Sequence, residues 1–90
     1  MSGTPQLSLV VAVYNGENFL SAFFDSIKKQ NLPSLELVIV NDGSTDGSAE
    51  IIARYASEFS HFNVIDQPNG GVSAARNTGL AAATGDYIAF

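Results

Sequence analysis

The sequence contains no cysteine and no tryptophan, and only four of its 90 residues are lysine or arginine. The absence of cysteine excludes disulfide bonds and thiolate metal sites, and it fits a reducing compartment. Nine acidic side chains give a formal net charge of −5, which argues against binding of nucleic-acid phosphates through clustered cations. No apolar run approaches the about 20 residues that span a membrane, and residues 1–6 lack the features of a signal peptide. We expect a cytoplasmic protein with a flexible segment at residues 1–6.

Two common phosphate-binding motifs are also missing. The sequence contains no G-x-x-x-x-G-K-[ST], which argues against a P-loop NTPase. No G-x-G-x-x-G follows the first apolar segment, which argues against a nicotinamide-binding site. The hydrophobic share of 46 % with 14 % charged residues is that of a globular chain, and 90 residues are enough for one small domain or part of a larger one.

The most informative stretch covers residues 37–47. Four apolar residues pass without interruption into a turn that contains Asp42. Such a run is typical of a strand that is buried on both faces, as in a parallel sheet. Ser44 and Thr45 are residue types that cap helices, and a helical pattern follows them. Asp42 is therefore expected at the C-terminal edge of a sheet, where open α/β sheets bind their ligands.

Apolar periodicity predicts alternating strands and helices along the whole chain. The strands are expected at 7–13, 36–40, 62–66 and 86–90, and the helices at 17–30, 48–59 and 73–83. This alternation implies parallel strands joined by right-handed helical crossovers. Asn31 and Pro33 are expected to end the first helix.

Two of the expected helices carry distinct packing patterns. In the first, five large side chains lie one turn apart on one side and are expected in the core: Phe19, Leu20, Phe23, Phe24 and Ile27. The third helix is rich in alanine and contains Gly79. Such small residues predict a close approach between this helix and the sheet.

Three loops follow three strands and should gather at one edge of the sheet. They present these polar and aromatic residues: Tyr14 and Glu17; Asp42; and the segment 69–73, followed by Arg76 and Asn77. An aromatic face stacks on a base, a carboxylate accepts hydrogen bonds from a base or a ribose, and an arginine pairs with a diphosphate. The combination suits a nucleotide without a P-loop.

Each of these residues also has a structural interpretation. Asp42 can serve as a turn-forming carboxylate, Tyr14 can pack on its loop neighbours, and Arg76 can pair with a nearby carboxylate. Glu17 can serve as a charge at a helix start, and Asp46 is interpreted mainly as a cap or first-turn charge.

Four segments resemble, in the same order, the motifs of family 2 glycosyltransferases: 11–17, 38–47, 69–79 and 85–90. They cover nearly the whole chain. The resemblance implies a GT-A fold, a Rossmann-like three-layer α/β/α arrangement whose parallel sheet has about four strands in the order 3-2-1-4. It also implies transfer of a sugar from a nucleotide-diphosphate sugar, expected to be a UDP-sugar, to a glycan or lipid acceptor, usually with inversion.

The resemblance also implies roles for individual residues. Ala12, Val13 and Tyr14 would line the base, and Asp42 would bind the uracil or ribose. Arg76 and Asn77 would lie towards the diphosphate and sugar, and Glu17 is counted with the nucleotide-binding residues. Two positions depart from the family pattern, because Ala12 stands where Pro is frequent and Asn41 where Asp is frequent. Neither departure removes the carboxylate of Asp42.

The family's metal-binding Asp-x-Asp follows directly after a strand such as Tyr87 to Phe90. We therefore expect the metal ligands and the catalytic base beyond Phe90, with no catalytic residue within the 90 residues. A divalent cation, Mn²⁺ or Mg²⁺, is expected for the full-length enzyme, whose expected location is the cytoplasm or the cytoplasmic face of the membrane. The 90-residue chain is expected to bind donor nucleotide without transferring sugar. An open edge beside the last strand predicts self-association.

Two other functions remain open at this point. One is a non-catalytic nucleotide-binding or self-associating α/β module. The other is a nucleotidyltransferase, which typically carries a glycine-rich loop with a lysine or arginine after its first strand. Residues 14–17 contain no such cation.

Overall fold

The structure, a computed structural model, describes residues 6–30, 34–85 and 87–89. Its elements are β1 (Leu7–Val13), α1 (Leu20–Gln30), β2 (Leu35–Asp42), α2 (Ser48–Tyr55), the 3₁₀ helix η1 (Ala56–Glu58), β3 (His61–Gln67), α3 (Val72–Ala82) and β4 (Tyr87–Ala89). The four strands are parallel and lie in the order β3-β2-β1-β4, which confirms the predicted order 3-2-1-4.

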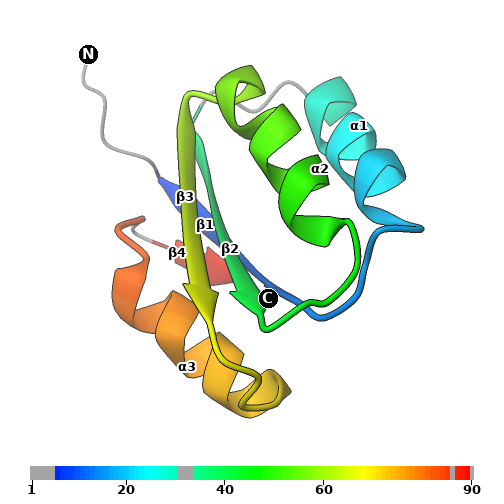
Figure 1. Cartoon of the computed structure of the whole chain (residues 1–90). Coiled ribbons are helices and arrows are strands. Elements are labelled where there is room, and N and C mark those ends of the chain that lie inside the picture. Colours follow the sequence, from blue (N-terminus) through cyan, green and yellow to red (C-terminus); the bar gives the residue numbers. More distant parts are fainter. Residues whose placement is uncertain (1–5, 31–33, 86, 90) are drawn as a thin grey trace.

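The sheet lies between two helical layers, with α1 and α2 on one face and α3 on the other (Figure 1). Successive side chains of a strand point to opposite faces, so odd and even positions serve different layers. Odd-numbered residues such as Val13, Leu37 and Ile39 belong to the core under α1 and α2. Even-numbered Val10 and Val40 lie under α3. All eight residues of β2 are buried, which explains its uninterrupted apolar run.

The core under α1 and α2 is built around the ring of Phe24. This side chain is fully buried and stacks on Tyr55 with ring centroids 4.9 Å apart. The rings of Phe59 and Phe62 lie 6.0 and 5.8 Å from it, and that of Phe23 lies 5.3 Å away in an edge-on arrangement. One side chain of α1 therefore joins α1, α2 and β3 into a single apolar cluster.

The start of α1 differs from the prediction. The helix begins at Leu20 and not at Glu17, because residues 17–19 form a turn in which the Gly16 carbonyl accepts hydrogen bonds from the N–H groups of Phe19 and Leu20. Phe19 therefore precedes the helix, and 52 % of its side chain is exposed. The expectation that Phe19 belongs to the core is wrong. Its four apolar partners in that prediction are buried or half-buried.

The start of α2 also corrects an expectation. Ser44 and Thr45 do not cap this helix, whose first residue is Ser48. The carboxylate of Asp46 accepts hydrogen bonds from the N–H of Ser48 (2.9 Å) and from its hydroxyl (2.6 Å). This confirms the interpretation of Asp46 as a helix-start charge. The predicted helix 48–59 is divided into α2 and η1.

Three expectations concern residues outside the described part of the chain. These are the helix stop at Asn31 and Pro33, the ends of the last strand at Asp86 and Phe90, and the flexibility of residues 1–5.

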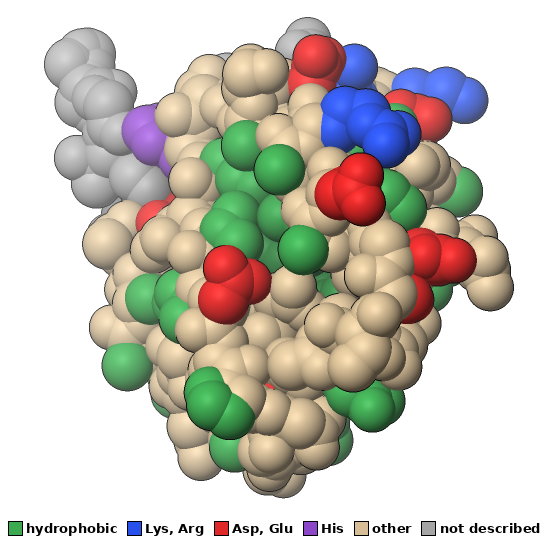
Figure 2. Space-filling model, viewed as in Figure 1, with side chains coloured by type: hydrophobic (Ala, Val, Ile, Leu, Met, Phe, Trp, Pro, Cys, Tyr) green, Lys and Arg blue, Asp and Glu red, His purple; other side chains and the backbone are tan. Residues whose placement is uncertain are grey.

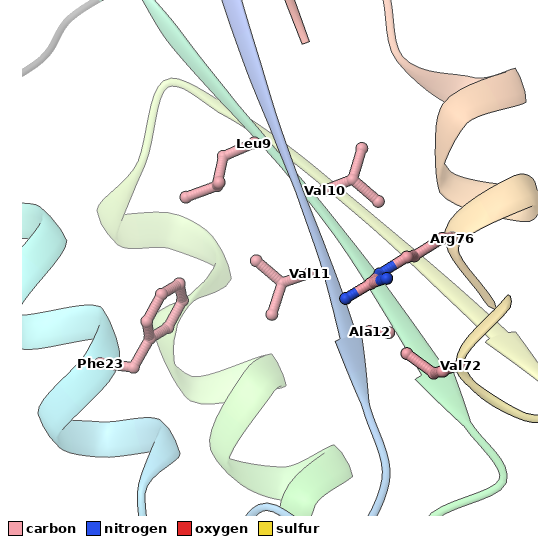
Figure 3. Close-up of a pocket in the computed structure, with 7 residues that line it drawn as sticks. All are labelled: Leu9, Val10, Val11, Ala12, Phe23, Val72 and Arg76. Atoms are coloured by element: carbon pink, nitrogen blue, oxygen red, sulfur yellow. The ribbon is translucent and has the colours of Figure 1, made fainter. Parts of the chain in front are cut away.

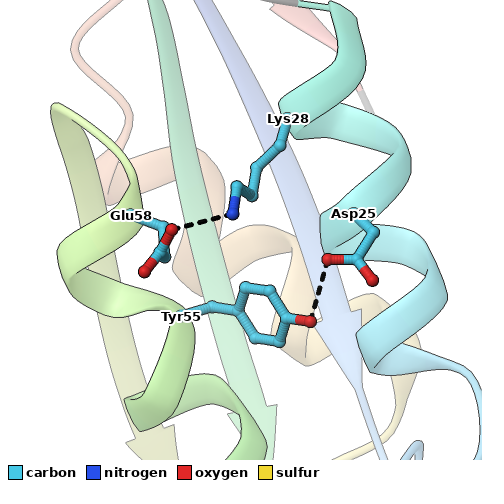
Figure 4. Close-up of polar contacts among 4 residues, drawn as sticks. All are labelled: Asp25, Lys28, Tyr55 and Glu58. Atoms are coloured by element: carbon cyan, nitrogen blue, oxygen red, sulfur yellow. Dashed lines mark hydrogen bonds and ion pairs between the residues drawn. The ribbon is translucent and has the colours of Figure 1, made fainter.

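Polar contacts join α1 to the α2–η1 segment at the surface. Lys28 forms an ion pair with Glu58 (2.8 Å), and the Tyr55 hydroxyl donates a hydrogen bond to Asp25 (2.9 Å) (Figure 4). The hydrogen bond to Glu58 raises the pKa of Lys28. Lysine and arginine side chains gather over the C-terminal ends of α1 and α2, where they complement the helix dipoles (Figure 2). Because these contacts are exposed, they add little to stability by themselves.

A buried carboxylate, that of Glu36, lies at the edge of the sheet where the strands begin. Glu36 is only 7 % exposed and accepts hydrogen bonds from the hydroxyl of Ser8 (2.6 Å) and the N–H of Thr84 (2.9 Å). The Ser8 hydroxyl in turn accepts from the N–H of Gly85 (2.8 Å). Burial is the largest influence and raises the pKa of Glu36, but the hydrogen bonds from Ser8 and Thr84 bring it below its ordinary value. This network attaches the α3–β4 connection to the first residues of β1 and β2.

The close approach of α3 predicts a cost for any side chain at position 79. A Cβ atom on Gly79 would overlap a methyl of Val10 and would lie 3.2 Å from a methyl of Val40. We expect Gly79→Ala to lower the free energy of unfolding by about 1–2 kcal/mol, because overpacking outweighs the gain in helix propensity. Urea unfolding measures the change, and Ala81→Ser on the exposed side of α3 is the control. Unchanged or increased stability of Gly79→Ala would contradict the close packing.

Candidate functional site

A pocket opens at the C-terminal edge of the sheet, on the face covered by α3. Its lining residues come from β1 and its loop, the end of β2, and the β3–α3 connection: Ala12, Val13, Tyr14, Asp42, Asn69, Gly71 and Val72. Ala12, Tyr14 and Asp42 are even-numbered positions of adjacent parallel segments. The alternation of side chains accounts for their meeting on one face. The predicted juxtaposition of Tyr14 and Asp42 is therefore confirmed.

The carboxylate of Asp42 is the centre of a hydrogen-bond network. Asp42 is the last residue of β2 and is 2 % exposed. One oxygen accepts from the side chain of Gln67 and the N–H of Gly70, both at 2.9 Å. The other accepts from the N–H of Gly71 at 2.9 Å and from the Asn69 amide at 3.4 Å. The β3–α3 loop thus folds around this carboxylate.

These hydrogen bonds also set the charge state of Asp42. The hydrogen bond from Gln67 lowers its pKa most, and the N–H of Gly70 adds to this effect. Burial acts in the opposite direction, and the N–H of Gly71 lowers the pKa further. Asp42 is therefore ionised at neutral pH and places a negative charge at the floor of the pocket.

Backbone conformation at two glycines, one in the β2–α2 loop and one in the β3–α3 loop, makes this arrangement possible. Gly43 has φ +75° and Gly71 has φ +94°, in the region that side chains rarely adopt. A Cβ atom on Gly43 would also lie 2.6 Å from the backbone nitrogen of Asn69. The loops after β2 and β3 can therefore approach closely only with glycine at position 43.

Arg76 lies beside the pocket. It projects from α3 across β1 and lines an adjoining hollow with these residues: Leu9, Val10, Val11, Ala12, Phe23 and Val72 (Figure 3). Ala12 and Val72 belong to both hollows, so Arg76 borders the site from the side of β1. Asn77 is exposed on α3 and lines neither hollow.

Glu17 also lies outside the lining of both hollows. Its carboxylate accepts a hydrogen bond from the N–H of Gly47, directly before α2. Its own N–H donates to Asp46 at 3.2 Å. The structure therefore brings together five of the seven residues expected at the site, from Ala12 to Arg76, and places Glu17 and Asn77 apart from the pocket.

The sequence predicted the segment 69–73 at this edge, but it did not identify Gln67 or show what these residues contact. Gln67 and Asn69 bind the Asp42 carboxylate, and Val72 forms an exposed apolar wall. The sequence after Gln67 predicted a turn, but it did not indicate that the amide groups of this turn bind the carboxylate of Asp42.

The described residues do not fit a divalent cation. Within them, no three His, Cys, Asp or Glu side chains are grouped so as to hold a metal ion. The carboxylate in the pocket, Asp42, already accepts hydrogen bonds on both oxygens. The same described residues include no helix that is long and apolar enough to cross a membrane.

Comparison with known proteins gives a consistent result. Residues 8–90 match the family model "Glycosyl transferase family 2". The chain is 46 % identical to the putative glycosyltransferase EpsH of Bacillus subtilis (strain 168), over 97 % of this chain and 25 % of that protein. The chain thus spans about a quarter of the length of this curated relative.

Solved structures share the fold. The mannosyltransferase PcManGT from Pyrobaculum calidifontis, in complex with GDP-Man and Mn²⁺, superposes with a TM-score of 0.84 and 29 % identity, covering 94 % of this chain and 26 % of that one. Residues 1–349 of S. aureus TarS give a TM-score of 0.85 and 31 % identity, with 92 % and 26 % coverage. These neighbours are GT-A glycosyltransferases, which confirms the predicted fold class.

Proposed function

Since the chain belongs to glycosyl transferase family 2, we propose that it forms the donor-nucleotide-binding part of an enzyme that transfers sugar from a nucleotide-diphosphate sugar. The observation that carries this proposal is the meeting of Tyr14 and Asp42 in one pocket at the C-terminal edge of a parallel sheet. That edge lies where β1 is flanked by β2 on one side and β4 on the other. Open α/β sheets bind ligands at such a switch point.

We assign the pocket residues as follows. The exposed ring of Tyr14 stacks on the base, with Ala12 and Val13 beside it. Asp42 faces the uracil or ribose, and because its oxygens already accept hydrogen bonds from β3 and the β3–α3 loop, it acts on the ligand through its negative charge and by holding that loop in place. Arg76 lies towards the diphosphate, whereas Asn77, which lines neither hollow, receives no contact with the donor in this assignment.

The chemical step needs groups that the described residues do not supply. We propose that the full-length enzyme uses Mn²⁺ or Mg²⁺ and a catalytic base from other parts of its chain, and that transfer proceeds with inversion. A divalent cation neutralises the charge of a leaving diphosphate. The 90-residue chain alone is expected to bind donor nucleotide but to transfer no sugar. Sugar transfer by the purified 90-residue chain would contradict this division.

The nucleotide-binding proposal predicts a defined response to UDP. Titration followed by backbone amide shifts should perturb residues 12–14, Asp42 and the 69–72 segment. Tyr14→Ala should weaken UDP binding about tenfold, because stacking of an aromatic ring on a base is lost. Tyr14→Phe keeps the ring and is the matched control, with affinity close to wild type. A parallel titration with GDP tests the preference for uracil, for which we expect tighter binding of UDP.

The opposite results of that titration are equally specific. Absence of shifts at millimolar UDP, or shifts confined to residues distant from Tyr14 and Asp42, would overturn the nucleotide-binding proposal. Equal affinity of Tyr14→Ala and wild type would remove the stacking role. Tighter binding of GDP would replace the UDP-sugar donor with a GDP-sugar.

A self-associating module is favoured by one feature of the sheet. β4 pairs with β1 only at Leu7, Ser8 and Leu9, so within the described residues no strand pairs with 10–13 of β1 on that side. Unpaired strand groups bind other strands. We propose that the isolated chain associates through this edge, in addition to binding nucleotide. Analytical ultracentrifugation over a range of concentrations measures this, and a monomer throughout the range would contradict it.

A further inference from the structure

We propose that Glu17 is a positioning residue, which holds the β1–α1 loop against the β2–α2 loop and thereby places Tyr14 at the pocket. This inference rests on the proposed nucleotide-binding function. It gives the carboxylate of Glu17 a role that requires no contact with the nucleotide.

The contacts of Glu17 are reciprocal. Its carboxylate accepts the N–H of Gly47, and its own N–H donates to the Asp46 carboxylate at 3.2 Å. Gly47 lies directly before the first residue of α2, so the negative charge of Glu17 also faces the positive end of that helix. Each loop therefore satisfies a backbone donor of the other.

Asn15, two residues before Glu17, makes the same kind of exchange with the β2–α2 loop. Its N–H donates to the hydroxyl of Ser44 (2.9 Å), and its side-chain oxygen accepts the N–H of Thr45 (2.8 Å). Asn15 has φ +52°, a conformation that asparagine tolerates better than most residues. The N–H of Gly16 donates to the hydroxyl of Ser48 (2.8 Å). Three consecutive backbone N–H groups of the β1–α1 loop are thus bound by side chains of the β2–α2 loop and of the first residue of α2.

These contacts matter because Tyr14 has little packing of its own. Its side chain is 55 % exposed, whereas Val13 before it is fully buried and pairs with Asn41 in the sheet. Tyr14 is therefore fixed from one side by the sheet and from the other by the loop contacts. Loss of the loop contacts would give the backbone around Tyr14 more conformational freedom. That freedom would have to be lost again when a ligand binds, which weakens binding.

The position of Glu17 also argues against direct contact with a nucleotide in the pocket. Glu17 lines neither hollow, and its partners Asp46 and Gly47 precede α2, on the opposite face of the sheet from α3. The carboxylate is already engaged with a backbone donor. The hydrogen bond from the Ser48 hydroxyl is the largest influence that lowers the pKa of the neighbouring Asp46, which is therefore also an anion. Two negative charges side by side do not favour an anionic nucleotide at this place.

Two variants at position 17 test this role in the 90-residue chain. Glu17→Gln keeps an oxygen that accepts the N–H of Gly47, and its UDP affinity should stay within about twofold of wild type. Glu17→Ala removes the acceptor, and its UDP affinity should fall about fivefold. In the absence of UDP, Glu17→Ala should also shift the amides of residues 14–16 and speed hydrogen exchange at Gly47. Shifts in β3 and α3 should stay small, which separates local loosening from unfolding.

The outcomes separate this inference from the proposed function. Equal loss of UDP affinity in Glu17→Gln and Glu17→Ala would show that the oxygen accepting the N–H of Gly47 does not maintain the site, and would overturn the positioning role. Full affinity and unchanged exchange at Gly47 in Glu17→Ala would overturn it as well. Failure of wild type to bind UDP would overturn the proposed function, while the exchange and shift measurements on the free protein would still test the loop contacts.

Discussion

Replacing Asp42 by asparagine is expected to weaken UDP binding by about tenfold or more, because several hydrogen bonds to a charged acceptor are lost together. The carboxylate accepts from Gln67, Gly70 and Gly71, all at 2.9 Å. An asparagine side chain has one acceptor oxygen and turns an NH₂ group towards the remaining donors. The β3–α3 loop, which supplies Asn69 and Gly71 to the pocket, then loses its anchor.

Amide hydrogen exchange provides an independent measure of this effect. In Asp42→Asn the amides of Gly70 and Gly71 should exchange faster than in wild type, with or without nucleotide. Asp66→Asn is the matched control, because Asp66 is exposed on β3 and its carboxylate makes no hydrogen bond to the pocket loops within the described part of the chain. Wild-type affinity and protected glycine amides in Asp42→Asn would show that the loop does not depend on this carboxylate.

The same substitution predicts a pH dependence of stability. The pKa of Asp42 lies below its ordinary value of 3.8, so the ionised carboxylate stabilises the folded state above that pH. This contribution is lost as the pH falls through the lowered folded-state pKa. The stability difference between wild type and Asp42→Asn should therefore be full at neutral pH and should shrink below about pH 4. If the stability difference between wild type and Asp42→Asn stayed the same in acid, it would not arise from the ionised carboxylate.

Replacing Phe24 by alanine is expected to have the largest effect on stability. The fully buried ring contacts the rings of Tyr55, Phe59 and Phe62. Removal of a buried phenylalanine side chain costs about 3–5 kcal/mol through lost apolar contacts and the remaining cavity. A chain of this length has a total stability of roughly 5–13 kcal/mol, so much of the population should unfold in low urea.

The neighbouring Phe19 is a matched control for this experiment. It has the same side chain five residues earlier, but it is half exposed and precedes α1. Phe19→Ala should change the free energy of unfolding by less than about 1 kcal/mol. Comparable losses in the two variants, measured by urea unfolding, would contradict the position of the core.

Much of the fold was predictable because its signals are local. The uninterrupted apolar runs mark strands that are covered on both faces, and the alternation of strand and helix patterns implies a parallel sheet. Strand periodicity was also enough to bring Tyr14 and Asp42 to one edge. The small residues around Gly79 correctly predicted the close approach of α3, because only a backbone without a Cβ atom fits against Val10.

Other features depended on contacts between distant residues. Phe19 fits the helical spacing but lies in the turn that connects β1 to α1, so its exposure was decided by where the helix begins. Glu17 and Gly47 are 30 residues apart, and Asp42 and Gly71 are 29 apart. No local period records such pairs.

By itself, then, the sequence determined the strands, the helices, their order and the edge at which the loops collect. These follow from periodicity and residue type, which act over a few neighbouring residues. The tertiary structure alone decided which donors bind the Asp42 carboxylate, and that Glu17 joins two loops and lies outside the pocket. A carboxylate accepts whichever N–H groups the packed loops bring to it, and that depends on segments that meet only after the sheet has formed.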